Sequence, residues 1–131
     1  FISLLKKFDP DFVLIELGGN DALRGYSIKL IKSNLEKMIA LIKQNKSKVL
    51  LMQIRIPPNY GQKYMLAFEK IYKDLALSEE VYLIPFMLEE IGINSDLMQP
   101  DGIHPNKKAQ SLIAKDVKKN IDKFLLINHS Y

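Results

Sequence analysis

The sequence predicts an α/β domain with a parallel sheet covered by helices on both faces, and the order of its apolar segments is the main evidence. Three short runs rich in branched apolar side chains predict buried strands at 12–17, 49–54 and 81–84. Segments with helical apolar spacing separate and follow these runs. Because parallel neighbours require right-handed crossovers through helices, the alternation indicates a parallel sheet.

The predicted helices occupy the segments between and after the strands. Ser27 can accept a hydrogen bond from the first turn of a helix, so it is the expected N-cap of the longest amphipathic segment. Two adjacent prolines remove backbone donors, so 55–61 is predicted to be a loop. The expected helical segments are 1–7, 27–45, 65–75, a helical turn at 86–91 and a final helix from Pro105 to Leu125, followed by a polar tail at 128–131 that includes His129.

Length and composition bound the class of protein. The chain has 131 residues, of which 47% are hydrophobic and 26% charged, as is usual for one globular domain, here assigned to 1–131. No apolar run approaches the roughly 20 residues that cross a bilayer, so no integral membrane segment is expected. Cysteine is absent, which excludes disulfides and thiolate metal sites. The chain opens at Phe1 without an initiator Met or a signal peptide, and we expect a fragment or a processed product.

The basic charge of the chain does not by itself indicate a nucleic-acid partner. The net charge is +4 and the isoelectric point is about 9.2, but the lysines are scattered over predicted helix faces. Scattered lysine without stacking aromatics is typical of a solvated surface, so no nucleic-acid partner is expected. The two arginines, Arg24 and Arg55, each fall in a loop that follows a predicted strand.

The first chemical motif is Gly-Gly-Asn-Asp at 18–21, directly after the first predicted strand. Two glycines allow a sharp turn that brings Asn20 and Asp21 to the carboxyl edge of the sheet. Ligands of open α/β sheets bind at this edge. The alternative is that Asn20 is only a turn residue that tolerates a left-handed conformation.

The second motif is Asp101-Gly102-Ile103-His104-Pro105. A carboxylate three residues before an imidazole can accept from one ring nitrogen and leave the other free, which is the base half of a catalytic triad. Pro105 suits the first turn of a helix, so His104 is expected at the N-terminal edge of the final helix, where the helix dipole favours a neutral ring. The alternative is a helix-capping Asp101 beside a surface histidine.

Together these motifs resemble the SGNH (GDSL-type) hydrolase family, close to its bacterial thioesterase I, lysophospholipase L1 and arylesterase branch. The resemblance covers nearly the whole chain and is carried by ELGGNDALRG, LLMQIRIPPNYG, the segment from Tyr64 to Tyr72, IPFMLEE and LMQPDGIHPN. It implies a three-layer α/β/α, flavodoxin-like fold with a parallel sheet, whose first strands are missing from this chain.

The resemblance also implies roles for individual residues. Asn20 is expected to donate its side-chain amide to the oxyanion, His104 to act as general base and Asp101 to orient it. Gly18 and Gly19 are expected to be needed for backbone conformation, and Asp21 to brace the loop. The family's nucleophile lies in a Gly-Asp-Ser-Leu block on the first strand, and a second oxyanion donor, a glycine, follows the second strand. No serine of this chain has that context, so both are expected upstream and the chain alone is expected to be inactive.

The loop at 55–61 is either a wall of the acyl pocket or a structural connection. On the first interpretation the substrate-binding candidates are Gly19, Arg55, Pro57 and Tyr60. Arg55 is also expected to pair with Glu16, because the two end neighbouring strands.

The function implied by the resemblance is that of a serine esterase or thioesterase, of the lysophospholipase or arylesterase kind, acting on small acyl esters or thioesters. No metal and no organic cofactor is expected, and the complete protein is expected to be monomeric and periplasmic or secreted. The alternative is a non-catalytic α/β fragment or a binding module without a nucleophile.

Overall fold

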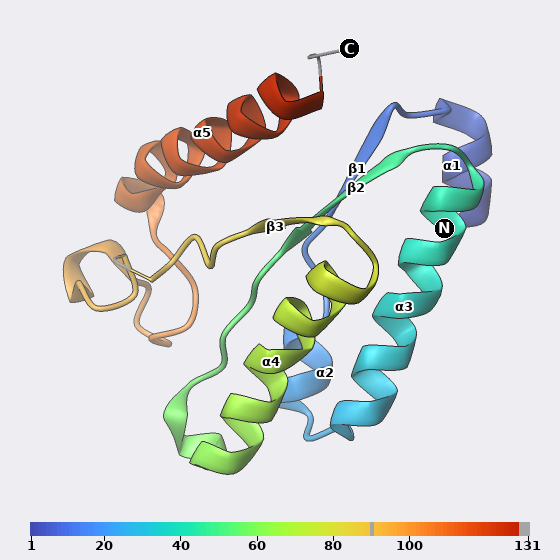
Figure 1. Ribbon diagram of the computed structural model, residues 1–131. Helices are drawn as coiled ribbons and strands as arrows, with labels where there is room; N and C mark the ends of the chain where they lie inside the picture. Colours follow the sequence, from blue (N-terminus) through green and yellow to red (C-terminus); the bar gives the residue numbers. More distant parts are fainter. Residues whose placement is uncertain (90, 129–131) are drawn as a thin grey trace. The chain divides into compact units, whose positions relative to one another are not determined.

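The computed structural model describes residues 1–89 and 91–128, with the side chain of Asn128 left aside, and alternates strands with helices (Figure 1). Its strands are β1 (Phe12–Ile15), β2 (Lys48–Met52) and β3 (Tyr82–Ile84), in the spatial order β1-β2-β3. β1 and β2 are parallel, with a register that runs from Phe12 opposite Lys48 to Ile15 opposite Leu51. The α/β class and the parallel pairing predicted from the sequence are therefore confirmed.

The chain forms two compact units, Phe1–Leu83 and Ile84–Tyr131. The single domain expected for 1–131 stays a prediction. The first unit contains most of the sheet, and the second contains the Asp-Gly-Ile-His motif and the last helix. The polar tail expected at 128–131, His129 included, lies outside the described residues except for the backbone of Asn128, as does Glu90.

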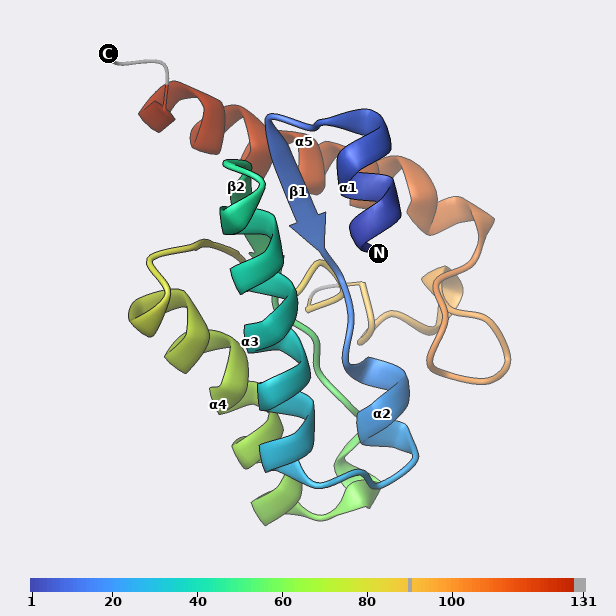
Figure 2. The ribbon, with the colours of Figure 1, turned by 90° about the vertical axis from the view of Figure 1, so that its right-hand side faces the viewer.

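The core of the first unit is built by two long amphipathic helices. α3 (Ile28–Gln44) and α4 (Gln62–Ser78) contact each other and β2, and both views of the ribbon show them side by side (Figures 1 and 2). As predicted, Ser27 caps α3, since its hydroxyl accepts from Leu30 N at 3.3 Å. The buried side chains that these helices and β2 contribute to this core are Ile31, Leu35, Ile39 and Ile42 from α3, Phe68, Ile71, Tyr72 and Leu75 from α4, and Val49 and Leu51 from β2.

Three shorter helical elements complete the first unit. α1 (Ile2–Phe8) precedes β1 and contributes the buried Leu5. α2 (Gly19–Leu23) follows β1, and the 3₁₀ turn η1 (Pro58–Tyr60) lies in the loop between β2 and α4. The connection between β1 and α3 therefore contains a short helix that the sequence did not indicate.

The first strand, which the sequence predicts to be buried, is buried in this chain on one face only. Ile15 is buried and Val13 half-buried, but Phe12 is 38% and Leu14 37% exposed. Alternate side chains of a strand point to opposite faces, and only the face of Val13 and Ile15 belongs to the core formed with α3 and α4. The strand also ends at Ile15, two residues earlier than predicted.

The second unit consists of turns followed by one long helix. Hydrogen bonds from Glu89 N to Phe86 O and from Gly92 N to Leu88 O form the turns expected near 86–91. The 3₁₀ turns η2 (Ser95–Leu97) and η3 (Lys107–Ala109) flank the motif, and α5 (Gln110–Asn128) follows without a break. α5 thus begins five residues later than expected.

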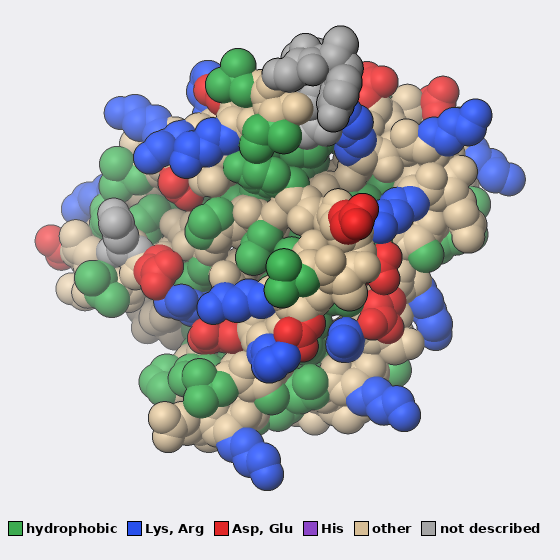
Figure 3. Space-filling view, in the orientation of Figure 1, with side chains coloured by type: hydrophobic (Ala, Val, Ile, Leu, Met, Phe, Trp, Pro, Cys, Tyr) green, Lys and Arg blue, Asp and Glu red, His purple; other side chains and the backbone are tan. Residues whose placement is uncertain are grey.

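The surface of the described residues carries charges of both signs in close alternation. Lysines pair with acids one turn away on the same helix, as in Lys70–Asp74 and Lys118–Asp122, both at 2.6 Å. The space-filling view likewise shows basic side chains dispersed among acidic and apolar ones (Figure 3). Among the helices described, none combines the length and the apolar character that a membrane span requires.

Candidate active site

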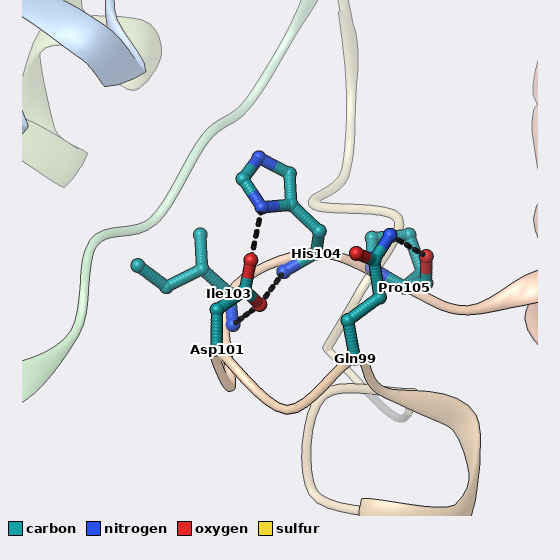
Figure 4. Close-up of polar contacts among 5 residues, drawn as sticks. All are labelled: Gln99, Asp101, Ile103, His104 and Pro105. Atoms are coloured by element: carbon teal, nitrogen blue, oxygen red, sulfur yellow. Dashed lines mark hydrogen bonds and ion pairs between the residues drawn. The ribbon is translucent and has the colours of Figure 1, made fainter.

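The loop that follows η2 is a tight turn organised by the Asp101 carboxylate. Its Oδ1 accepts hydrogen bonds from Ile103 N at 2.9 Å and from His104 N at 3.0 Å. Its Oδ2 lies 2.7 Å from His104 Nδ1 (Figure 4). Gly102 makes the turn possible, because its φ of 67° is in the left-handed region that other residues avoid. Four consecutive residues therefore suffice to join the carboxylate to the imidazole, as the sequence predicted.

The electrostatics of this turn determine which ring nitrogen of His104 faces the carboxylate with a proton. The backbone hydrogen bond from His104 N, the one from its ring and the one from Ile103 N lower the pKa of Asp101 to about 2. An ionised carboxylate only accepts, so Nδ1 must carry the shared proton. In the neutral ring Nε2 is then the nitrogen with the free lone pair, and it points away from Asp101 (Figure 4). His104 is 67% exposed, and its ring makes no other hydrogen bond with the described residues.

The Asp101 turn is held by main-chain and amide hydrogen bonds that the sequence analysis missed. Gln99 N donates to His104 O at 2.7 Å, and its side-chain Nε2 donates to Pro105 O at 3.1 Å. Asn106 Nδ2 donates to Asp96 O at 2.8 Å and to Met98 O at 3.1 Å. An asparagine just before a helix signals a cap, so Asn106 could have been recognised. Gln99 carried no comparable signal.

Two expectations about the start of the last helix are wrong. Pro105 does not open a helix but forms an isolated antiparallel bridge with Met98, and His104 lies before the cap rather than at the helix edge. Asp101 does not cap the helix either. The cap is Asn106, whose Oδ1 accepts from Lys108 N at 2.9 Å. The tautomer of His104 therefore rests on Asp101 and not on the helix dipole.

The Gly-Gly-Asn-Asp motif forms the beginning of α2, after the carboxyl end of β1. Gly18 is the N-cap, with a φ of 110°, and Asn20 is an exposed residue of the first turn. No described residue is hydrogen-bonded to the side-chain amide of Asn20, so it is available to a ligand. Asp21 braces the loop through its main chain, because its carbonyl accepts from Tyr26 N at 3.0 Å.

Close packing bears on both glycines, whereas a left-handed backbone is found only at Gly18. The expectation that Gly19 is needed for backbone conformation is therefore wrong. A Cβ on Gly18 would lie 2.7 Å from the Tyr72 hydroxyl, and one on Gly19 would lie 3.3 Å from Ile54 Cγ2. Gly19 thus lets the loop after β2 approach the Asn20 turn, as expected of neighbouring parallel strands. The segment from Tyr64 to Tyr72 was part of the family resemblance, but no role was predicted for Tyr72, since a tyrosine at helical spacing is usually an ordinary core residue.

The loop between β2 and α4 is a short ordered turn. Arg55 Nε lies 3.5 Å from Glu69 Oε1 of α4, and Glu16 makes no ion pair with the described residues. The expected Glu16–Arg55 pair is therefore wrong, because the strand ends before Glu16. Pro57 caps η1, and Tyr60 within it is 37% exposed. The substrate-binding roles of Gly19, Arg55, Pro57 and Tyr60 stay predictions.

The chain has a parallel α/β sheet, an oriented carboxylate–imidazole pair and an exposed amide after a strand. These are the parts of an α/β protein of the acyl-hydrolase class. Residues 2–112 match the GDSL-like lipase/acylhydrolase family, and the chain belongs to this family.

Relatives with known names agree with this assignment. The chain is 49% identical to an arylesterase of Vibrio mimicus over 123 residues, covering 94% of this chain and 62% of the relative. It is 44% identical to thioesterase 1/protease 1/lysophospholipase L1 of Escherichia coli K12 over 127 residues, covering 97% and 60%. The crystal structure of the psychrotrophic esterase EstA from Pseudoalteromonas sp. matches with a TM-score of 0.91 and 40% identity, over 94% of this chain and 67% of that one.

The family and the flavodoxin-like α/β fold predicted from the sequence are thus confirmed. The chain spans about 60% of the length of the curated relatives it matches. Asn20 belongs to the first unit, whereas Asp101 and His104 belong to the second. That they meet in one site, with the roles assigned above, stays a prediction.

Proposed function

We propose that the complete protein containing this chain is a serine esterase or thioesterase, in which Asp101 and His104 are the acid–base pair and Asn20 is an oxyanion donor. The 2.7 Å contact between Asp101 Oδ2 and His104 Nδ1 carries the proposal, because it leaves Nε2 as a free base. The esterase and thioesterase names of the relatives support the reaction class.

In this mechanism a serine hydroxyl attacks the carbonyl carbon of an ester or thioester while His104 Nε2 takes its proton. The Asn20 amide donates a hydrogen bond to the oxyanion of the tetrahedral intermediate. His104 then returns the proton to the leaving alcohol or thiol, and an acyl-enzyme remains. Water, deprotonated by the same nitrogen, then attacks the acyl carbon. The bond to the serine oxygen breaks, His104 returns the proton to that oxygen, and the carboxylic acid is released. No metal or organic cofactor takes part.

The nucleophile in this proposal lies outside the 131 residues. Ser27 caps α3, and Ser47 accepts from Asn45 Nδ2 at 3.2 Å, so both have structural contacts. No serine of the described residues is hydrogen-bonded to His104. The same observation favours the second candidate, a binding module or fragment without catalysis, if the complete protein also lacks such a serine.

The substrate assignment rests on the family. We propose a small acyl ester or thioester whose acyl chain lies along Pro57 and Tyr60, with Gly19 and Arg55 at the mouth of the site. A monomeric, periplasmic or secreted enzyme remains the expectation from the resemblance.

The proposed function is tested by replacing the base in the complete protein. His104→Ala should lower kcat for p-nitrophenyl butyrate by about 10³-fold or more, while the unfolding transition is retained. His129→Ala, the variant of the only other histidine of the chain, is the matched control and should keep wild-type turnover. Equal turnover of His104→Ala and the wild type would favour the non-catalytic candidate.

A further inference from the structure

Two tyrosines of α4 hold the short helix that contains Asn20. Tyr72 donates its hydroxyl to the carbonyl of Leu17, just before α2, at 2.9 Å. Tyr64 donates to the carbonyl of Tyr26, just after α2, at 2.6 Å. Residues four and eight positions apart lie along one ridge of a helix, so both tyrosines reach the same neighbouring segment.

The Tyr72 contact is built into the core. Its side chain is fully buried, and its ring packs edge-on against Phe68 with the centroids 5.4 Å apart. The hydroxyl lies directly beneath Gly18, where an added Cβ would come within 2.7 Å of it. The N-cap of α2 is therefore fixed both by the hydrogen bond to Leu17 and by close contact.

The Tyr64 contact fixes the other end of α2. The carbonyl of Ala22 also lies 3.4 Å from the Tyr64 hydroxyl, and Tyr26 N donates to the carbonyl of Asp21 at 3.0 Å. Burial, and then the negative charge of Asp21, raise the pKa values of Tyr64 and Tyr72, which keeps both hydroxyls protonated as donors.

A helix of five residues is too short to be stable by itself, so its position depends on what holds its ends. The side chain of Asn20 makes no hydrogen bond with the described residues that would fix its direction. We propose that Tyr64 and Tyr72 are positioning residues for the Asn20 amide: they fix both ends of α2 and thereby aim this side chain. The inference rests on the proposed oxyanion role of Asn20, and the tyrosines themselves touch no substrate.

The first test measures amide hydrogen exchange across α2 in the complete protein. Tyr72→Phe and Tyr64→Phe should each speed exchange of the Ala22 and Arg24 amides, which bond to Gly18 O and Asn20 O, by about tenfold, and the double variant by more. Ile71→Val, a buried change on the same helix, is the control for general loss of stability and should leave exchange at α2 nearer the wild type. Equal exchange in Tyr72→Phe and Ile71→Val would overturn the inference.

The second test is a double-mutant cycle on turnover. Tyr72→Phe should lower kcat about tenfold with KM within twofold, and it should add nothing to the loss already caused by Asn20→Ala, because both changes remove the same contribution. Losses that multiply would show that Tyr72 acts elsewhere and would overturn the inference. If Asn20→Ala itself leaves kcat unchanged, the proposed role of Asn20 as an oxyanion donor is wrong. The exchange measurement still decides whether the tyrosines fix α2.

Discussion

The Asp101 carboxylate orders its own loop and the imidazole at the same time. One oxygen accepts two main-chain hydrogen bonds, and the other meets the ring. A group with so many donors is ionised at any pH at which enzymes of this family would work.

The first prediction concerns pH. The pKa of Asp101 is lowered to about 2 from an ordinary value of 3.8, so its contribution to loop stability is fully present above pH 3.8 and is lost as the pH falls towards 2. The carboxyl carbon of Asp101, followed by NMR, should titrate with a midpoint near 2. Asp101→Asn should remove this titration and, on the proposed mechanism, lower kcat of the complete protein by about 10⁴-fold. A midpoint near 3.8 would mean that the turn is open in solution.

The second prediction separates backbone strain from a clash. Gly18→Ala should destabilise the fold by about 1–3 kcal/mol through its positive φ, with an added cost from the Tyr72 hydroxyl. Gly25→Ala is the matched control, because its φ is 74° and nothing lies within 4 Å of the added Cβ. Urea unfolding should show that Tyr72→Phe partly rescues Gly18→Ala. If Gly25→Ala is equally destabilising, the clash contributes nothing.

The strand, helix and turn assignments show where sequence reasoning is effective. The apolar spacing of 27–45 and 65–75 correctly indicated α3 and α4, because burying one face of a helix leaves a periodic trace. The start of α5 was misplaced because Pro105 suits both a helix start and a bridge, and the choice depends on Met98 and Asn106. Such non-local hydrogen bonds leave no periodic signal.

The third prediction concerns the loop that holds His104. Asn106→Ala should lose the cap of η3 and the two amide hydrogen bonds to the loop, and we expect it to lower the free energy of unfolding by about 1–3 kcal/mol. Urea unfolding and amide exchange at Met98 and Ala109 measure this. Asn94→Ala removes only the Asn94 Oδ1 contact with Asp96 N and is the control. Equal effects of the two variants would show that the extra hydrogen bonds do not hold the loop.

The chain as a whole combines a correctly predicted fold with an incompletely predicted surface. Family, class and the Asp101–His104 contact followed from the sequence, since the motif residues are only three positions apart. The apolar run of β1 by itself predicts burial, because such a run gives no information on how many neighbours its strand has. The exposed edge was expected only from the resemblance to a family whose sheet has further strands. Phe12, Leu14 and Leu17 are 38%, 37% and 51% exposed, and β1 is an edge of the sheet that the structure describes.

The last prediction is that the 131-residue chain, expressed alone, is inactive and self-associates through β1. An edge strand with exposed apolar side chains is a template for pairing with another chain. Leu14→Lys places a charge on that face, so sedimentation should show less association than for the wild-type chain. Leu77→Lys is the control, because Leu77 is 82% exposed on α4, away from the sheet edge, and its change should alter association little.

The chain should hydrolyse no p-nitrophenyl ester and react with no fluorophosphonate probe. Labelling of one of its own serines, lost in His104→Ala, would place the nucleophile within these residues and contradict the mechanism proposed above.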